Sequence, residues 1–207
     1  MWRRDRSDAR VWDEEVKIAL EAESAGFDSI WSVEHHFTDY TMCPDPLQFL
    51  TYIAGQTSTI QLGTGVVVLP WHDPMRVAEQ ITMLDNLSGG RLILGVGRGL
   101  ARVEYEGFGV DMNTSRQKLV EMAECVLAGL EDGYLEYDGE VVTQPRRDLR
   151  PAPQHSFKGR TYAAAGAPEP KPTMAKLVGG LLISPQKPRH LIHMCTHSPY
   201  QPADSVD

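Results

Sequence analysis

The chain has 207 residues, of which 42% are hydrophobic and 23% are charged, and its formal net charge is −8 at pH 7. This size and composition predict one globular domain with its own core, and the negative charge argues against a nucleic-acid surface. No apolar run reaches the roughly 18 residues that a membrane span needs. Cys43, Cys125 and Cys195 form no Cys-x-x-Cys pair. This fits reduced thiols, so we expect a cytoplasmic protein.

The start of the chain predicts one helix and one strand. Residues 1–12 are charged at their beginning, and we expect an irregular segment there. Residues 13–25 carry apolar side chains at helical spacing, and Gly26 is typical of a helix end. Residues 27–33 then predict a strand.

Two Asp-Pro pairs mark the next helix starts. Asp45-Pro46 and Asp73-Pro74 each place an N-cap residue before a proline suited to the first helical position. We expect the first of these helices to run to Ala54 and the second to end at Gly89-Gly90. Between them, residues 60–69 are apolar and β-branched, which is typical of a strand buried on both faces.

The second half of the chain continues the alternation. A helix is expected after Asn113-Thr114-Ser115, and a short helix core over residues 174–177. Asp138-Gly139 predicts the turn of a hairpin. Strands or hairpin strands are expected, in chain order, at residues 91–96, 134–142, 162–165 and 180–184. Arg146, Arg147 and Arg150 lie among prolines, and we interpret this basic cluster as a solvated linker.

Alternating helices and apolar strands predict a parallel sheet covered by helices. Right-handed crossovers leave two architectures open, a doubly wound open sheet and a (β/α) barrel. We count about five core strands, whereas an eight-stranded barrel takes about 250 residues. If the fold is a barrel, we therefore expect it to be incomplete, spanning residues 13–188.

The tail formed by residues 189–207 has no sustained period. Its composition fits two interpretations, a disordered tail or a sequence altered by a change of reading frame. His190, His193, Cys195 and His197 resemble the spacing of metal ligands, which raises the alternative of a zinc hydrolase. We expect no metal site there, because the tail is irregular.

Polar residues follow the apolar strands at three places, namely Glu34-His35-His36, the Gly63-Thr64-Gly65 stretch and Gly97-Arg98-Gly99. In a parallel α/β fold these strand ends meet at one crevice, where active sites lie. Adjacent histidines point in different directions and would not share one metal, and no His-Glu-x-x-His helix is present. The glycines admit either a flat ligand or neighbouring side chains. Gly95, Gly97 and Gly99 do not have the Rossmann spacing.

Two arginines are candidates for binding an anion. Arg98 lies between two glycines, and its guanidinium can pair with a phosphate through two hydrogen bonds. Arg116 lies just inside a predicted helix start, beside free backbone N–H groups. The alternative is that both arginines are structural ion-pair partners.

Three stretches together resemble the bacterial luciferase-like flavin-dependent monooxygenases: AGFDSIWSVEHHFTDY, LGTGVVVLPWHDPMRVAEQITMLDNLSGGRLILGVGRG and FGVDMNTSR. The resemblance runs from about Trp12 to Pro188. It implies a (β/α)8 TIM barrel that binds reduced FMN, which a separate flavin reductase often supplies. The flavin reacts with O2 to give a C4a-peroxyflavin, which attacks an aldehyde-like substrate. Members are commonly dimers, through the helices that flank the second strand.

The resemblance also implies roles for single residues. His35 matches the active-site histidine, acting as a base, and His36 could exchange roles with it. Gly65-Val66 lies where the family often has a cis peptide bond, and Glu104 falls in a mobile loop over the site. Further cofactor-binding positions are Gly97, Arg98, Gly99 and Arg116. Trp71, His72 and Met75 are expected either near the pocket mouth or in the core or an interface.

The chain departs from the family pattern in three ways. The first strand is replaced by the charged start of the chain, the last strands are absent, and the loop from Gly166 to Pro170 lacks the hydroxyl of a phosphate loop. Two alternatives to the monooxygenase therefore stay open. One is an oxidoreductase that uses the deazaflavin F420, and the other is a non-catalytic flavin-binding subunit or inactive fragment.

Overall fold

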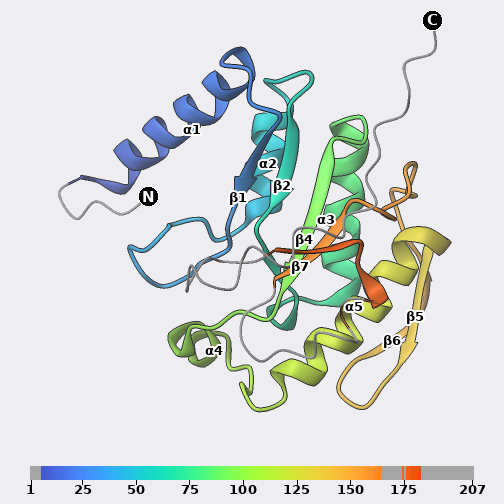
Figure 1. Cartoon of the computed structure of the whole chain (residues 1–207). Helices are drawn as coiled ribbons and strands as arrows, with labels where there is room; N and C mark the ends of the chain where they lie inside the picture. The colour runs from blue at the N-terminus through green and yellow to red at the C-terminus, as the bar shows by residue number, and fades with distance from the viewer. Residues whose placement is uncertain (1–5, 165–173, 175, 183–207) are drawn as a thin grey trace, which may run out of the picture.

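The computed structural model describes residues 6–164, 174 and 176–182 (Figure 1). Five strands form a parallel sheet in the order β1-β2-β4-β7-β8, and the short β3 pairs with β4. Their bounds are β1 Ser29–Ser32, β2 Gln61–Thr64, β3 Val67–Val68, β4 Leu92–Gly97, β7 Thr161–Ala164 and β8 Gly180–Leu182. The predicted parallel sheet is therefore confirmed. No helix in the described ranges is long and apolar enough to cross a membrane.

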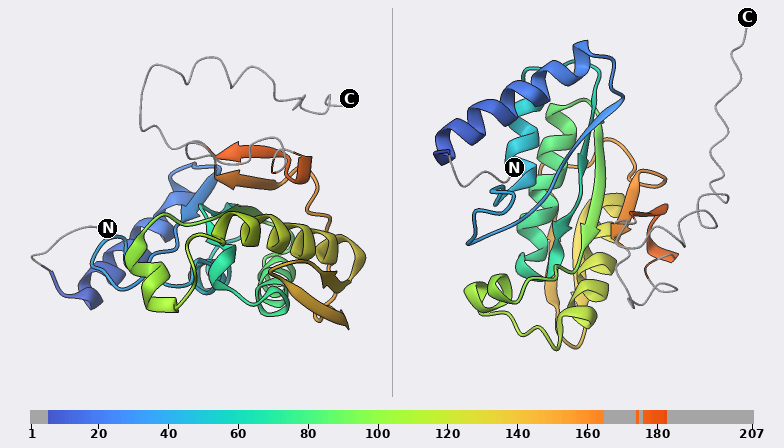
Figure 2. Two further views of the ribbon diagram at one scale, coloured as in Figure 1. Left: turned by 90° about the horizontal axis from the view of Figure 1, so that it is seen from below. Right: turned by 60° about the vertical axis from the view of Figure 1, so that its left-hand side comes forward.

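The long helices pack against one face of this sheet (Figure 2). They are α1 Asp8–Ser24, α2 Pro46–Ala54, α3 Pro74–Leu87 and α5 Ser115–Asp132. Their apolar stripes and the alternate strand residues form one core, in which Leu62, Ile81, Leu94 and Val126 are fully buried. This burial is the main favourable contribution to folding, because it removes apolar surface from water.

The two Asp-Pro pairs begin helices as predicted. The carboxylate of Asp45 accepts a hydrogen bond from the N–H of Gln48 at 2.9 Å, and Asp73 accepts one from Arg76 at the same distance. In both helices the proline occupies the first turn, where its missing N–H leaves no hydrogen bond unmade. These local signals fix where α2 and α3 leave the crevice end of the sheet.

Two predictions are wrong, one at the start of the chain and one in the second strand. Helix α1 begins at Asp8, with Ser7 as its N-cap, so residues 8–12 are helical and not irregular. The strand expected over residues 60–69 is interrupted after Thr64 and resumes as β3, and a 3-10 turn, Leu69–Trp71, follows it. The interruption places residues 65 and 66 at the crevice.

The hairpin is shifted relative to the prediction. It consists of β5 Tyr134–Asp138 and β6 Thr143–Asp148, so the linker assigned to Arg146 and Arg147 is the second hairpin strand. Residues 139–142 form the turn. Glu121 of α5 fixes that turn, because its carboxylate accepts the N–H groups of Val141 and Val142 at 2.9 and 2.8 Å.

A buried ion pair secures the amino end of the sheet. Asp85 is 1% exposed and binds Arg160 through two hydrogen bonds, of 2.5 and 3.0 Å, and His155 at 3.1 Å. Arg91 donates to the carbonyl oxygens of Ala54, Thr57 and Ile60. The stretch from Asp85 to Arg91, which carries part of the family resemblance, therefore holds α2, α3 and the strand starts together.

Candidate functional site

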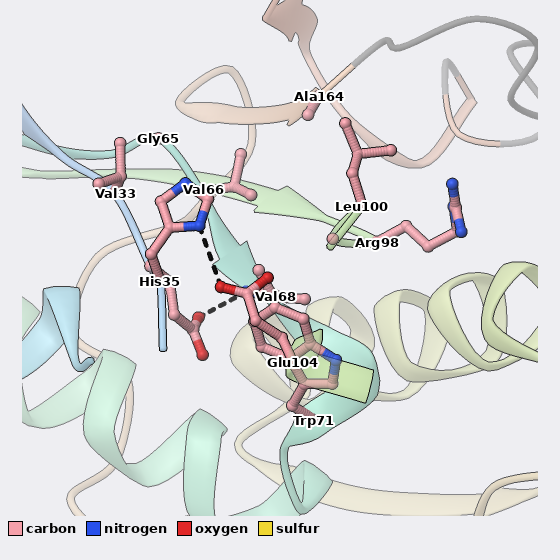
Figure 3. A pocket seen from close by; sticks show the side chains of 12 residues that line it. Val33, His35, Gly65, Val66, Val68, Trp71, Arg98, Leu100, Glu104 and Ala164 are labelled. Carbon is pink, nitrogen blue, oxygen red and sulfur yellow. Dashed lines mark hydrogen bonds and ion pairs between the residues drawn. The ribbon is translucent and has the colours of Figure 1, made fainter. Parts of the chain in front are cut away.

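A pocket lies at the carboxyl ends of β1, β2 and β4, where the sequence predicts a site (Figure 3). Its cavity volume is about 170 Å³. Six of the residues expected at the site line it, together with residues of the neighbouring loops. The lining comprises Val33, Glu34, His35, Gly65, Val66, Val68, Trp71, Arg98, Gly99, Leu100, Glu104 and Ala164. Most of these side chains are apolar, so the few polar groups would fix the orientation of a ligand.

His35 is held by a carboxylate. Its Nδ1 lies 3.0 Å from Oε1 of Glu104, and its backbone N–H donates to the carbonyl of Cys43 at 3.0 Å. The side chain of His35 is 31% exposed, whereas that of Glu104 is 2% exposed. Because an ionised carboxylate only accepts, Nδ1 of a neutral His35 carries the proton and Nε2 keeps its lone pair. Figure 3 shows this second nitrogen on the side of the ring that faces away from Glu104.

Glu104 lies on a helix that the sequence analysis did not predict. Helix α4, Arg102–Phe108, follows β4, and its carboxylate residue points back at the end of β1. Oε1 also accepts the backbone N–H of His36 at 2.9 Å. Oε2 is buried and has no hydrogen-bond partner within the described ranges. The expected mobile loop is therefore a helix at this residue, and its contact in the structure is with His35.

His36 is turned toward a different carboxylate. Its Nε2 lies 3.3 Å from Oε1 of Glu34, and Nε2 of His72 lies 2.8 Å from the same oxygen. Oε2 of Glu34 accepts the N–H of Val68 at 2.7 Å. His36 is not among the residues that line the pocket. The structure thus separates the two histidines: His35 faces the pocket, and His36 joins a buried network beneath it.

Glu34 carries a negative charge at the centre of this network. Burial by itself raises the pKa of its fully buried carboxyl, but the hydrogen bonds from His36 and His72, the charge of His72 and the Val68 N–H together outweigh burial. The net result is a pKa of Glu34 below its ordinary value. This carboxylate therefore ties the end of β1 to β3 and the turn that follows it.

Aromatic rings connect the network to α4. The ring of His36 contacts Trp71 and Phe108 edge to face, with centroid distances of 5.4 and 4.6 Å. Phe37 has φ 62° and lies over Gly107, where a Cβ atom would come within 2.3 Å of its ring. A non-glycine residue at positive φ is uncommon. Here it turns Phe37 onto α4 and so supports the contact of Glu104 with His35.

The glycines of the site have different reasons to be small. A Cβ on Gly97 would lie 2.5 Å from Val66, and one on Gly99, which has φ 77°, would lie 2.7 Å from Trp71. These two glycines therefore make room for neighbouring side chains, which was one of the two interpretations. At Gly65 a Cβ would meet only ordinary contacts, the nearest at 3.6 Å. The Gly65-Val66 peptide bond is cis, as the resemblance predicts.

The two arginines are placed differently from each other. Arg98 lines the pocket, and its Nη1 donates to the hydroxyl of Ser115 at 3.2 Å. Figure 3 shows its guanidinium extending away from His35. Arg116 is exposed in the first turn of α5 and is not among the lining residues. Of the two arginines, the structure therefore brings only Arg98 into the lining of the pocket.

Several residues of the site were missed or left open in the sequence analysis. The partners Glu34 and His72 are 38 positions apart, so no local pattern joins them. Trp71, left open between pocket and core, lines the pocket, whereas Met75 packs against the core. Within the described ranges no group of three His, Cys, Asp or Glu side chains is arranged so that it could hold a metal ion. The loop Gly166–Pro170, the tail residues 189–207 and Cys195 lie outside those ranges.

Comparison with known proteins decides the family. The family model described as luciferase-like monooxygenase matches residues 2–197. The chain belongs to this family. It is 34% identical over 166 residues to an alkanal monooxygenase alpha chain of Photorhabdus luminescens, covering 78% of this chain and 43% of that protein. It is 32% identical over 161 residues to the oxygenase component of a flavin-dependent trigonelline monooxygenase of Acinetobacter baylyi, covering 77% and 44%.

Solved structures confirm an incomplete (β/α)-barrel fold of the luciferase-like type. A monooxygenase of Streptomyces bottropensis superimposes with a TM-score of 0.80 at 26% identity, over 89% of this chain and 57% of that one. The oxygenating constituent of 3,6-diketocamphane monooxygenase of Pseudomonas putida, in complex with FMN, gives 0.73 at 19%, over 86% and 54%. The F420-dependent tetrahydromethanopterin reductase of Methanopyrus kandleri gives 0.65 at 25%, over 83% and 52%. The chain spans about half or less of the length of these relatives.

Proposed function

We propose that this luciferase-like chain forms one wall of a flavin-dependent monooxygenase site that uses reduced FMN and O2 to oxidise a small, aldehyde-like substrate. The observation that carries the proposal is the His35–Glu104 pair, which presents an imidazole nitrogen to an apolar pocket beside the cis Gly65-Val66 bond. Such a group can remove or return a proton at a reacting centre, because its ordinary pKa lies near neutrality.

The described residues fit part of a flavin. The apolar wall suits a planar ring, the buried Oε2 of Glu104 offers an unused acceptor, and Arg98 offers a cation for a phosphate. The cavity of about 170 Å³ is smaller than the roughly 300–1,000 Å³ of typical ligand pockets. We infer that these residues hold one side of the cofactor, and that Gly97 and Gly99 act by admitting Val66 and Trp71.

The chain's own residues have distinct tasks in this proposal. A bound reduced flavin supplies the electrons that activate O2. His35 accepts and returns a proton at Nε2, and Glu104 keeps the His35 proton on Nδ1. The Glu34 network holds the wall formed by Val68 and Trp71, which excludes water from the pocket. His36 is then a positioning residue, and Arg116 has no direct contact with the ligand in this proposal.

The test of this proposal separates binding from turnover. We expect the His35→Asn chain to bind FMN with unchanged affinity and to lose oxidation of a test aldehyde such as decanal, assayed with reduced FMN and a flavin reductase. The Glu106→Gln chain is the matched control, because Glu106 is exposed on α4. Loss of FMN binding together with activity in the His35→Asn chain would show that His35 serves binding instead.

The F420-dependent reductase among the structural neighbours favours a second candidate, an F420-dependent oxidoreductase. Absorbance titration of the chain with FMN and with F420 discriminates the two. A third candidate, a flavin-binding subunit or an inactive fragment, predicts flavin binding without turnover, or no cooperative unfolding of the chain. We place the protein in the cytoplasm and expect a flavin reductase and a second subunit as partners, and size-exclusion chromatography tests the dimer.

A further inference from the structure

The pocket contains a buried carboxylate oxygen to which no described residue donates a hydrogen bond. Oε1 of Glu104 receives two hydrogen bonds, from His35 and His36, whereas Oε2 has none within the described ranges. Glu104 is only 2% exposed and lines the pocket. A carboxylate oxygen buried without a donor is unfavourable, because it has lost water and gained no hydrogen bond in return. A ligand with a suitably placed N–H or O–H donor would remove this penalty.

We propose that Oε2 of Glu104 accepts a hydrogen bond from an N–H group that the flavin ring carries only in its reduced form, so that Glu104 makes the site select reduced over oxidised flavin. This inference rests on the proposed function. Glu104 is bonded to His35, the proposed proton-transfer residue, and so faces the part of the ring where protons are gained and lost. The flavin ring also carries an N–H group in both redox states, but that group neither gains nor loses a proton on reduction.

A carboxylate interacts more favourably with the reduced flavin ring than with the oxidised ring. A ring nitrogen that is protonated on reduction changes from an acceptor to a donor. A carboxylate attracts the donor and repels the lone pair of the acceptor. Glutamine at position 104 has the same shape and keeps an oxygen for His35 and His36, but it turns an NH2 group toward the ligand. The preference of the site should then weaken or reverse.

The experiment measures binding and not turnover. The full chain and its Glu104→Gln variant are titrated calorimetrically with oxidised FMN in air and with dithionite-reduced FMN under anaerobic conditions. We expect the variant to bind reduced FMN roughly tenfold more weakly, as for the loss of one charge-assisted hydrogen bond, and oxidised FMN as well as or better than wild type. A tenfold change in the affinity ratio lowers the potential of the bound flavin by about 30 mV.

Two further variants serve as controls, one at a different residue of α4 and one at position 104 itself. The Glu106→Gln chain, which changes an exposed carboxylate on α4, should bind both forms of FMN like wild type. The Glu104→Asp chain keeps the charge and should retain a preference for reduced FMN. Equal weakening of both forms by Glu104→Gln, or no change in either, would overturn the inference and leave the proposed function intact. Failure of the wild-type chain to bind either form would refute the proposed function itself.

Discussion

Glutamine in place of Glu34 keeps the shape of the side chain but removes its charge. Glu34 accepts three hydrogen bonds, from His36, His72 and the backbone of Val68. An amide has only one acceptor oxygen. In the variant the two histidine hydrogen bonds become neutral, each worth roughly 1 kcal/mol less than a charge-assisted one, and the Val68 N–H faces an NH2 group and loses its acceptor, which costs about 1 kcal/mol or more. The free energy of unfolding should therefore fall by about 3 kcal/mol. For a domain of this size that is a decrease of about 6–12 °C in the melting temperature.

Thermal unfolding followed by circular dichroism measures this decrease, with Glu106→Gln as the exposed control. The pH dependence gives a second check. The pKa of Glu34 is lowered in the folded state, so its contribution is complete above the unfolded value of about 4.3 and is lost as the pH falls through the folded value. The gap between wild type and variant should therefore close below about pH 4. A variant that melts within about 1 °C of wild type at pH 7 would refute this account of the network.

Three further predictions follow from contacts outside this network. Asp85→Asn breaks the buried pair with Arg160 and should lower the free energy of unfolding by about 3 kcal/mol, while the affinity for FMN stays unchanged; a weaker affinity would contradict the separation of the two sheet ends. Gly107→Ala should destabilise the chain by about 1–3 kcal/mol by colliding with Phe37, and the loss should shrink in a Phe37→Ala background, as a double-mutant cycle measures. Burial, and then the charge of Asp73, raise the pKa of Cys125 to about 11, so at pH 8 it should react with a disulfide reagent only after unfolding, in a chain whose other cysteines are serine.

Local signals in the sequence predicted those parts of the fold that depend on neighbours in the chain. The Asp45-Pro46 and Asp73-Pro74 pairs placed two helix starts correctly, because a cap and a proline act within one turn. The break between β2 and β3 was missed, since its residues are as apolar as the strands on either side. Helix α4 was missed because its N-cap position is an alanine without a side-chain cap.

The site was predictable in position but not in its pairing. Strand ends in a parallel sheet meet at one edge, which located His35 and Arg98 from the sequence. The partner of His35, however, is Glu104, 69 positions away, and Glu34 reaches His72 across 38 positions. No periodicity connects such residues. Which of two adjacent histidines faces the pocket therefore depends on the carboxylate that each one meets, and only the structure supplies that information.

The buried Asp85–Arg160 pair and the Arg91 hydrogen bonds lie at the opposite end of the strands from His35. The residues that hold the helices and strand starts together are thus a different set from those that contact a ligand. Substitutions in the loops after the strands can then alter what the pocket accepts while the anchoring end stays intact. A chain built in this way can acquire new substrates by changes at the carboxyl ends of its strands alone. Directed evolution confined to residues 98–112 should therefore yield more folded variants than the same number of mutations placed on residues 85–91.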